Sequence, residues 1–449
     1  MDRKAVQKEI FRLSFPTMGG FLCQSLYDIV DMVFIGMLDK AAIAASTIFI
    51  TLFWVLEVLN EIVGASSVSM ISQAYGSGDM EKTRQISQET IFFKVVLAII
   101  GAAVMGLLLP WFYNLYSDDP AVVKYGMDYG VIRLAFLPVF FSSYTVNTIF
   151  RCTGDAKTPM RLLIIASVMN VVLDPICMFD TVPGTSIPGL GWGITGAAVA
   201  TVVSISFSFI AGFALLLAGK APIRIKFREI FHLHGSIDKK LILVGLPSGC
   251  NLLLRNLSTF VILKLVSSFG TEAIAILGVA TRIYQFAIVP SNGISMGSGI
   301  IVGHCLGAEK EGDAKLSVHL TMLDCFLFSG VFALVIWFFP SSLLSLFLGG
   351  EAPGADGVFL MRVFVPCILC LSLMSGFSAA FNGSGYTKPF VYSAVISQWG
   401  ASVPYALVVT LLLHKSLPWL WVAYIVGDAV DLLSRFLFYR KGSWLRKRV

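Results

Sequence analysis

Five carboxylates stand in stretches of this chain that are otherwise apolar. Asp28 and Asp31 are three residues apart, Glu57 and Glu61 are four apart, and Asp174 lies in a third stretch. Side chains three or four residues apart share one face of a helix. Carboxylates exchange protons and supply the hard oxygen ligands that small cations prefer. The five residues therefore predict ion chemistry in an apolar setting.

Three of these acids, Asp28, Glu57 and Glu61, admit more than one interpretation. Acids on neighbouring helices repel each other when all are ionised, so at least one is expected to titrate near neutral pH. They are candidates for the wall of a cavity, where they would extend a cation site or neutralise a cationic substrate. The alternative is a buried ion pair with Lys94 or Arg133 in the same half of the chain.

A polar pair accompanies the third stretch. Asn170 and Asp174 are four residues apart, which places an amide and a carboxylate on the same helical face. Pro175 has no N–H group, so it leaves the carbonyl of Val171 without its helical partner. This face predicts either part of an ion site or a hydrogen-bonded contact between helices.

The elements that must position these side chains are membrane helices. Of the 449 residues, 56% are hydrophobic and only 13% are charged, and the mean hydropathy is +0.81. Soluble domains carry about 25% charged residues, so this class is excluded. Apolar stretches long enough to cross ~30 Å of hydrocarbon recur along the chain. The predicted fold is all-α with twelve spans at about 10–37, 41–72, 88–116, 122–150, 160–180, 191–218, 240–268, 272–304, 317–348, 355–383, 388–413 and 417–439.

The distribution of basic residues predicts the orientation. With both termini in the cytoplasm, about 23 of the 33 Lys and Arg residues fall in cytoplasmic segments and about four outside, as the positive-inside rule requires. We therefore expect a multi-pass protein of the inner (plasma) membrane. The net charge of +6 follows from this topology and does not indicate a nucleic-acid partner.

The chain contains an internal repeat with a constant offset of 231 residues. The landmarks that match are Pro16 with Pro247, Ala42-Ile43-Ala44 with Ala273-Ile274-Ala275, Gly76 with Gly307, Gly154 with Gly385 and Lys157 with Lys388. Six spans per copy is an even number, so both copies enter the membrane in the same direction and are related by a pseudo-two-fold axis along the membrane normal. The predicted domains are two six-helix bundles, 1–218 and 240–449, joined by an amphipathic cytoplasmic connector at 219–239.

The acids are not repeated. The five carboxylates fall opposite Thr259, Ile262, Ile288, Asn292 and Tyr405. The charges that we recognise in the spans of the second half are mostly basic: Arg255, Lys264, Arg282 and Asp324. We therefore expect the first bundle to contain the ion site. Arg255 and Arg282 leave open an anionic or zwitterionic substrate, although arginines in spans more often pack against carbonyls or headgroups.

Two other classes of protein are disfavoured. The Gly-x-x-x-x-Gly-Lys-[Ser/Thr] spacing of a phosphate-binding loop is absent, so no nucleotide is expected and an ion gradient must supply the energy. The five histidines are scattered among loops and helix ends, so no enzyme constellation and no cofactor is expected. His232 and His234 lack companion ligands for a metal.

Several motifs taken together resemble the MATE (multidrug and toxic compound extrusion) family, and the resemblance covers essentially all twelve spans. Its carriers are Leu26-Tyr-Asp-Ile-Val-Asp-Met-Val-Phe-Ile-Gly36, Gln73-Ala-Tyr-Gly76, Arg151-Cys-Thr-Gly-Asp-Ala-Lys-Thr-Pro159, Asn170-Val-Val-Leu-Asp-Pro175 and Gly193-Ile-Thr-Gly-Ala-Ala-Val-Ala-Thr201. The resemblance implies two bundles that alternate between outward and inward openings. It also implies an antiporter that expels amphipathic, often cationic compounds in exchange for inward Na+ or H+.

The resemblance also implies roles for individual residues. Asp31 corresponds to an ion-coupling acid, and the face with Asn170 and Asp174 looks toward it, with Thr201 contributing a hydroxyl. These oxygens would suit Na+ or a shared proton but not zinc. Bending of the first helix at Pro16 is expected to accompany protonation. Further cavity candidates are Tyr27, Asn147 and, as an aromatic surface for a drug, Tyr144.

Alternatives remain open at this stage. A lipid-linked oligosaccharide flippase shares the broader architecture but would favour a cationic cavity for pyrophosphate. An exporter of an anionic or zwitterionic metabolite would use Arg255 or Arg282. The expected partners are a small amphipathic substrate and the lipid bilayer, and the expected assembly is a monomer.

Overall fold

The structure is a computed structural model that describes residues 3–230, 234–347, 354–447 and 449. Within these residues the only β pairing is an isolated bridge between Thr181 and Pro188. In the described part of the chain, ten helices and one bent pair are long and apolar enough to cross a membrane; the twelfth predicted span forms the helix Leu417–Arg440 but is not among them. The predicted stretches therefore do form helices, and the chain is a multi-pass membrane protein. Residues 231–233 of the predicted connector lie outside the described residues.

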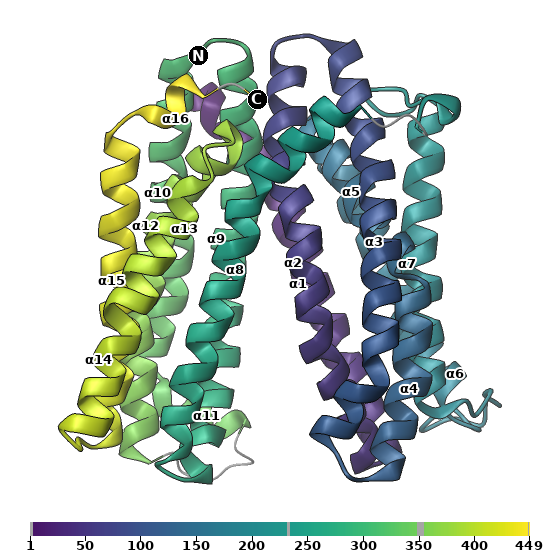
Figure 1. The fold of residues 1–449 in the computed structure, drawn as a ribbon, viewed down its shortest axis with the longest axis vertical. Helices are drawn as coiled ribbons and strands as arrows, with labels where there is room; N and C mark the ends of the chain where they lie inside the picture. The colour runs from purple at the N-terminus through teal and green to yellow at the C-terminus, as the bar shows by residue number, and fades with distance from the viewer. Residues whose placement is uncertain (1–2, 231–233, 348–353, 448) are drawn as a thin grey trace. The chain divides into compact units, whose positions relative to one another are not determined.

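The first of two compact units consists of Gly19–Tyr75 and Asp79–Ile242. Its helices are the later part of α1 (Arg3–Leu38), α2 (Lys40–Gly76), α3 (Met80–Tyr116), α4 (Pro120–Ala135), α5 (Leu137–Cys152), α6 (Lys157–Met178) and α7 (Gly193–Leu217), followed by the short helix η1 (Phe227–Glu229). These helices run side by side as a bundle (Figure 1). We call this unit the N-terminal lobe.

Local sequence signals explain where helices of this lobe begin. Asp79 precedes α3, and its carboxylate accepts a hydrogen bond from the N–H of Lys82 at 2.9 Å. Asp119 precedes α4 and accepts from the N–H of Ala121 at 2.9 Å, with Pro120 in the first turn. Such caps satisfy amide groups that have no partner inside the helix.

One predicted span of the lobe is broken. The stretch 122–150 forms α4 and α5, which are bent by 49° at Phe136. Pro138 cannot donate a backbone hydrogen bond, so the carbonyl of Leu134 loses its helical partner and the helix bends there. The bend places the start of α5 beside α7, where both contribute to a cavity described below.

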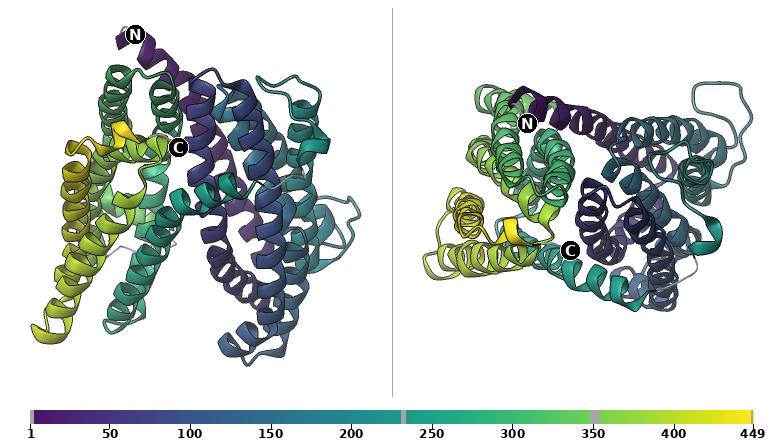
Figure 2. Two further views of the ribbon diagram at one scale, coloured as in Figure 1. Left: turned by 45° about the horizontal axis from the view of Figure 1, so that its top comes forward. Right: turned by 90° about the horizontal axis from the view of Figure 1, so that it is seen from above.

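The second compact unit consists of Met1–Met18, Gly76–Gly78 and Leu243–Val449. Its helices are the later part of α8 (Gly235–Ser267), α9 (Thr271–Gly307), α10 (Glu311–Phe338), α11 (Pro340–Phe347), α12 (Ala355–Ser384), α13 (Lys388–Ala394), η2 (Val395–Ser402), α14 (Val403–Leu407), η3 (Val408–Leu412), α15 (Leu417–Arg440) and α16 (Ser443–Arg446). We call this unit the C-terminal lobe; Figure 2 shows its helices from two further directions.

The start of α1 packs within the C-terminal lobe. The Ser14 hydroxyl donates to the carbonyl of Ile294 at 3.3 Å, and the Gln7 amide donates to both Asp324 oxygens at 2.7 Å. Gly297 permits this approach, because a Cβ there would lie 2.5 Å from Ser14 Oγ. The chain thus passes between lobes inside α1, after Met18.

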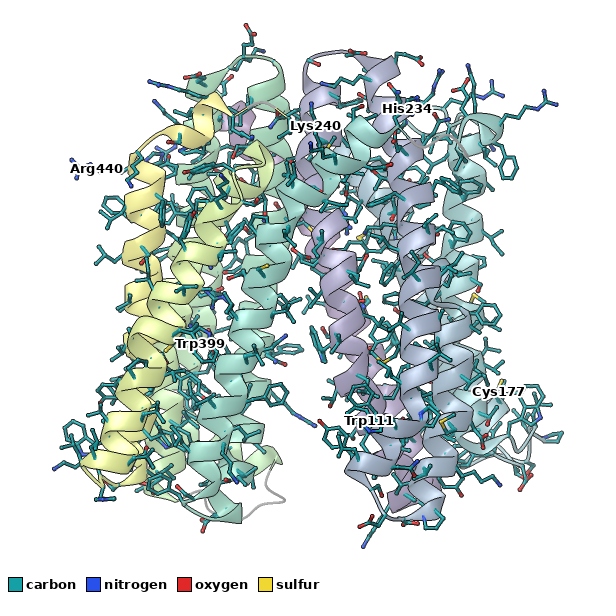
Figure 3. The ribbon with its side chains drawn as sticks, viewed as in Figure 1. Trp111, Cys177, His234, Lys240, Trp399 and Arg440 are labelled. Carbon is teal, nitrogen blue, oxygen red and sulfur yellow. The ribbon has the colours of Figure 1, made fainter. Side chains whose placement is uncertain are left out.

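The eleventh predicted span is helical, but two parts of it, η2 and η3, are π-helical. A π-helix widens the backbone, and such turns often occur at functional sites. Trp399, labelled in Figure 3, lies within η2, and its indole N–H donates to the carbonyl of Leu254 in α8 at 3.1 Å. Pro404 follows η2 and lacks the N–H group that a regular α-helical ladder would require there.

Candidate ion-coupling and substrate site

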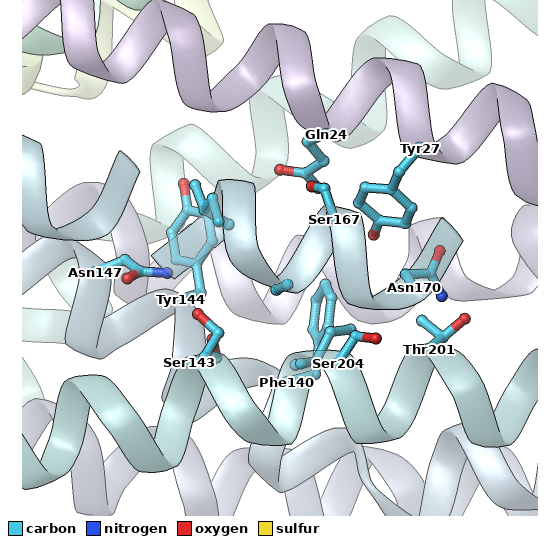
Figure 4. A pocket seen from close by; sticks show the side chains of 14 residues that line it. Gln24, Tyr27, Phe140, Ser143, Tyr144, Asn147, Ser167, Asn170, Thr201 and Ser204 are labelled. Atoms are coloured by element: carbon cyan, nitrogen blue, oxygen red, sulfur yellow. The ribbon is translucent and has the colours of Figure 1, made fainter. Parts of the chain in front are cut away.

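A polar cavity lies inside the N-terminal lobe. Its wall comes from α1, α5, α6 and α7, and it includes Tyr27, Asn147, Asn170 and Thr201, four of the residues singled out in the sequence (Figure 4). The cavity volume is about 70 Å³. This admits a few waters or a small hydrated cation, whereas drug-sized ligands occupy cavities of roughly 300–1,000 Å³. In this conformation the cavity is therefore of the size that an ion needs.

Asn170 and Asp174 are fully buried on one face of α6. The Asn170 amide donates to Asp174 Oδ1 at 3.2 Å. Asn170 Oδ1 and Asp174 Oδ2 have no hydrogen-bond partner among the described residues. A buried acceptor without a donor is costly, so both oxygens are ready to accept a proton, a water or a cation.

Two further candidate oxygens come from α1 and α7, helices that also contribute to the cavity wall. Asp31 Oδ1, on α1, is buried without a hydrogen-bond partner in the described chain, and the Asp31 carboxylate interacts electrostatically with Asp174. The Thr201 hydroxyl on α7 donates to the carbonyl of Ala197 at 2.9 Å, which leaves its lone pairs available. Carboxylate, amide and hydroxyl oxygens form a hard ligand set that suits Na+ or a proton.

The counter-charge for these acids is Arg133 on α4. It interacts electrostatically with Asp28 and Asp31 but forms no ion pair within 4.0 Å of a carboxylate among the described residues. Its guanidinium instead lies over the rings of Phe53 and Tyr129, at 5.6 and 5.8 Å from their centroids. One arginine therefore faces several carboxylates without binding any of them directly.

The remaining acids of the prediction lie in different surroundings. Asp28 is exposed on α1, and none of the five acids, Asp31 and Asp174 included, lines the polar cavity. Glu57 Oε2 accepts a hydrogen bond from Asn60 at 3.2 Å, and Asn60 in turn accepts one from Lys94 at 2.7 Å. Lys94 is therefore linked to Glu57 through the Asn60 amide and not by a direct ion pair.

In the C-terminal lobe, Arg255 on α8 is engaged with Asp431 on α15 and donates to Asn251 Oδ1 at 3.1 Å. Asp431 also accepts hydrogen bonds from Arg435 at 3.0 and 3.2 Å. Arg282 is exposed on α9. Pro16 lies within the continuous helix α1, near its passage between the lobes.

The spans of the second half contain charges beyond the four expected from the sequence. Asp428, Asp431 and Arg435 all lie in α15, so the charges named in the spans of this half become four basic residues and three acidic ones. The signal was present in the sequence, because three charged residues follow one another at helical spacing within the twelfth predicted span. Among the described residues, no group of three or more His, Cys, Asp or Glu side chains could hold a metal ion.

Comparison with known proteins decides the family. The MatE family model matches residues 16–176 and 247–408. The chain belongs to the MatE family. The two matches begin 231 residues apart, which is the offset of the internal repeat. This membership confirms the family resemblance, and it makes the chain a membrane transport protein of the MATE type.

Proteins similar to this MatE chain align with most or all of its length. "Probable multidrug resistance protein YoeA" of Bacillus subtilis is 26% identical and covers 100% of this chain and 96% of its own. "Multidrug export protein MepA" of Staphylococcus haemolyticus is 22% identical (98% and 94%). A protein named "FAD transporter" of Shewanella oneidensis is 23% identical over 76% of this chain and 74% of its own.

Solved structures confirm the fold. The crystal structure of a MATE protein in complex with MaL6 matches with a TM-score of 0.90 and 23% identity over 99% of this chain and 98% of that one. A MOP superfamily transporter from Pyrococcus furiosus, described as having a binding pocket of reverse polarity, matches equally well, at 0.90 and 23% over 99% and 97%. The twelve-helix MATE fold predicted from the sequence is thus confirmed.

Proposed function

We propose that this MATE-family protein is a multidrug efflux antiporter, which exports amphipathic organic cations in exchange for inward Na+ or H+. The single observation that carries the proposal is the set of buried, unpartnered acceptor oxygens on Asp31, Asn170 and Asp174. A carboxylate in a membrane span costs at least ~2.5–3.5 kcal/mol, so an unpaired one needs a proton, a cation or a cavity. The names of the relatives YoeA and MepA support the substrate class.

The mechanism that follows is competition between the coupling ion and the cationic substrate for the negative charge of this site. When Na+ or a proton occupies the oxygens of Asp31, Asn170, Asp174 and Thr201, it cancels one of the two negative charges of the carboxylates. When it leaves, the site attracts a cationic substrate. Each occupied state favours one opening of the transporter, so ion influx drives substrate efflux. The proposal includes a plasma-membrane location, cytoplasmic termini and a monomeric assembly.

The test uses purified protein in liposomes with ethidium as a fluorescent organic cation, and Na+ and pH gradients imposed separately. We expect one gradient to drive ethidium movement, and Asp31→Asn and Asp174→Asn each to abolish it. Asp324→Asn is the matched control, because Asp324 is also a carboxylate in a span but is bonded to Gln7. Normal gradient-driven transport by both site variants would refute the coupling site.

A second candidate is export of an anionic metabolite. The name of the relative described as an FAD transporter favours this candidate. Arg133 also favours it, because this positively charged residue lines a second cavity. The second cavity adjoins the polar one, and the two share Phe140 and Ile205. In the same liposomes, gradient-driven movement of FAD without movement of ethidium would support this candidate over the first.

A further inference from the structure

We propose that residues 219–230 of the connector form a docking surface for the headgroups of anionic phospholipids. Arg224 and Arg228 supply positive charge to this surface, and Phe227 lies between them in the sequence. We call residues 219–230 the connector surface. The inference goes beyond the proposed export, because it concerns the partner of a segment that contributes nothing to the polar cavity.

The two sides of this segment differ in chemistry. Three isoleucines are buried: Ile223, Ile225 and Ile230 are 5%, 1% and 5% exposed. The side chains of Arg224, Lys226 and Arg228 are exposed, and so is Phe227, to 56%. The segment therefore has an apolar inner side and an outer side on which an aromatic ring stands among basic residues.

Contacts with α3 hold the segment in place. The Gln88 side-chain amide donates to the backbone carbonyl of Lys226 at 3.0 Å. Arg84 forms an ion pair with Glu229 at 3.2 Å. Both partners on α3 belong to the N-terminal lobe, as the connector surface does. The outer side chains are therefore presented by a backbone that is bonded to the lobe.

The segment lies at the depth of the lipid headgroups. The span α7 ends at Leu217, and the Arg224 side chain donates to the Leu217 carbonyl at 3.3 Å. A Cβ at Gly212 of α7 would lie 3.1 Å from Leu162 of α6, which runs antiparallel to α7. The exposed Lys157, at the start of α6, is therefore level with the end of α7. Both spans end at this level, so the connector surface follows directly on the hydrocarbon region.

The surface carries more positive than negative charge. Lys226 pairs with Glu229 at 2.9 Å, and Arg84 pairs with both Glu229 and Glu81. These two cations and two acids compensate each other. Three further cations of the connector surface form no ion pair within 4.0 Å in the part of the chain that the structure describes: Lys220, Arg224 and Arg228.

This combination fits the surface of a bilayer. Basic residues next to a membrane span are attracted to anionic lipids, and the cytoplasmic leaflet is the anionic one. The distribution of basic residues assigns the connector to that side. An exposed aromatic ring beside the charges adds apolar contact at the boundary between headgroups and acyl chains. A soluble phosphate would use the cations but would leave Phe227 in water, so we commit to the lipid.

The experiment measures lipid retention by the purified full-length protein in native mass spectrometry, with equal amounts of phosphatidylglycerol and phosphatidylcholine. Wild type should retain phosphatidylglycerol preferentially. Arg224→Gln/Arg228→Gln should weaken that binding about 25-fold, because each basic residue near an anionic surface contributes about fivefold. The matched control is Lys310→Gln/Lys315→Gln, which removes two exposed cations near the start of α10 and should keep the preference.

Two further variants keep the test decisive. If the double variant does not fold, Arg228→Gln alone should weaken phosphatidylglycerol binding about fivefold. Phe227→Ser should weaken the retention of both lipids, because its contact is apolar.

Four results would overturn the inference. They are equal retention of the two lipids by wild type, wild-type affinity in a folded Arg224→Gln/Arg228→Gln protein, an equal loss in the control, and displacement of the lipid by excess inorganic phosphate. The last result would indicate a site for a free anion. No gradient is applied, so the outcome is independent of the antiport proposal.

Discussion

Replacing Asp431 in the C-terminal lobe tests how strongly a buried ion network stabilises the protein. Asp431 is fully buried and accepts hydrogen bonds from Arg435 at 3.0 and 3.2 Å and from Arg255. In Asp431→Asn the amide keeps one acceptor oxygen, but two guanidinium groups lose the carboxylate between them. Removing one partner of a buried pair costs about 3–5 kcal/mol, because an uncompensated charge stays buried.

For Asp431→Asn we expect a loss of stability at the lower end of this range, about 3 kcal/mol, because the Arg255 side chain is 28% exposed and can be rehydrated. Arg255→Met is the matched comparison. Asp431 then keeps both bonds from Arg435, whereas the hydrogen bonds that Arg255 donates to Asp431 and Asn251 are lost. Because no charge is left buried without a partner, we expect a smaller cost of about 1.5 kcal/mol.

The assay is thermal unfolding in detergent, followed with a thiol-reactive dye. Five of the free cysteines are buried and become reactive only on unfolding: Cys152, Cys177, Cys305, Cys325 and Cys367. The melting temperature should fall in both variants and further in Asp431→Asn. An Asp431→Asn protein as stable as wild type, or more stable than Arg255→Met, would show that the network does not stabilise the lobe.

Three further predictions use the same purified protein. Gly126→Val should lower the melting temperature by an amount equivalent to about 1–3 kcal/mol, because a Cβ at this position would lie 2.0 Å from Tyr113 Cε1. Gly106→Ala should leave the melting temperature unchanged, because no atom lies within 4 Å of a Cβ at that position. Asp79→Ala removes the α3 cap and should cost about 1 kcal/mol in the same melt. The hydrogen bond from Lys226 lowers the pKa of the Glu229 carboxyl below its usual 4.5. This contact therefore stabilises the connector above pH 4.5, and the stabilisation is lost as pH falls through the lowered pKa. An acid-active protease should accordingly cut the connector faster as pH falls over that range. The Glu229→Gln variant should show no such pH dependence.

The sequence predicted the helices well because the membrane allows few alternatives. An uninterrupted apolar stretch of some twenty residues in lipid must satisfy its backbone as a helix. The bend at Phe136 and the π-helical turns of η2 and η3 were not predicted. They depend on how a single proline and the neighbouring helices redistribute backbone hydrogen bonds, which hydropathy does not report.

The site was predicted in part. Tyr27, Asn147, Asn170 and Thr201 do line one cavity, because helical spacing and the family motifs fix which faces they share. The bridge from Lys94 through Asn60 to Glu57 could not be read from the sequence, since it joins two helices whose register is set by packing. Asp428 and Asp431 of α15 fall opposite Ala197 and Ala200 of the first copy, so the acids of the first copy do not point to them.

The passage of α1 between the lobes has a consequence for synthesis. Ser14 finds its native partner at Ile294, 280 positions further along the chain. At about 5–20 residues per second, the ribosome needs roughly 14–56 s to reach that partner. For this time the first helix lacks its native partners from Arg3 to Met18, and the C-terminal lobe cannot be completed from its own half of the chain. A nascent chain stalled before α9 should therefore expose the start of α1 to chaperones and proteases, however well the helices that follow it have packed.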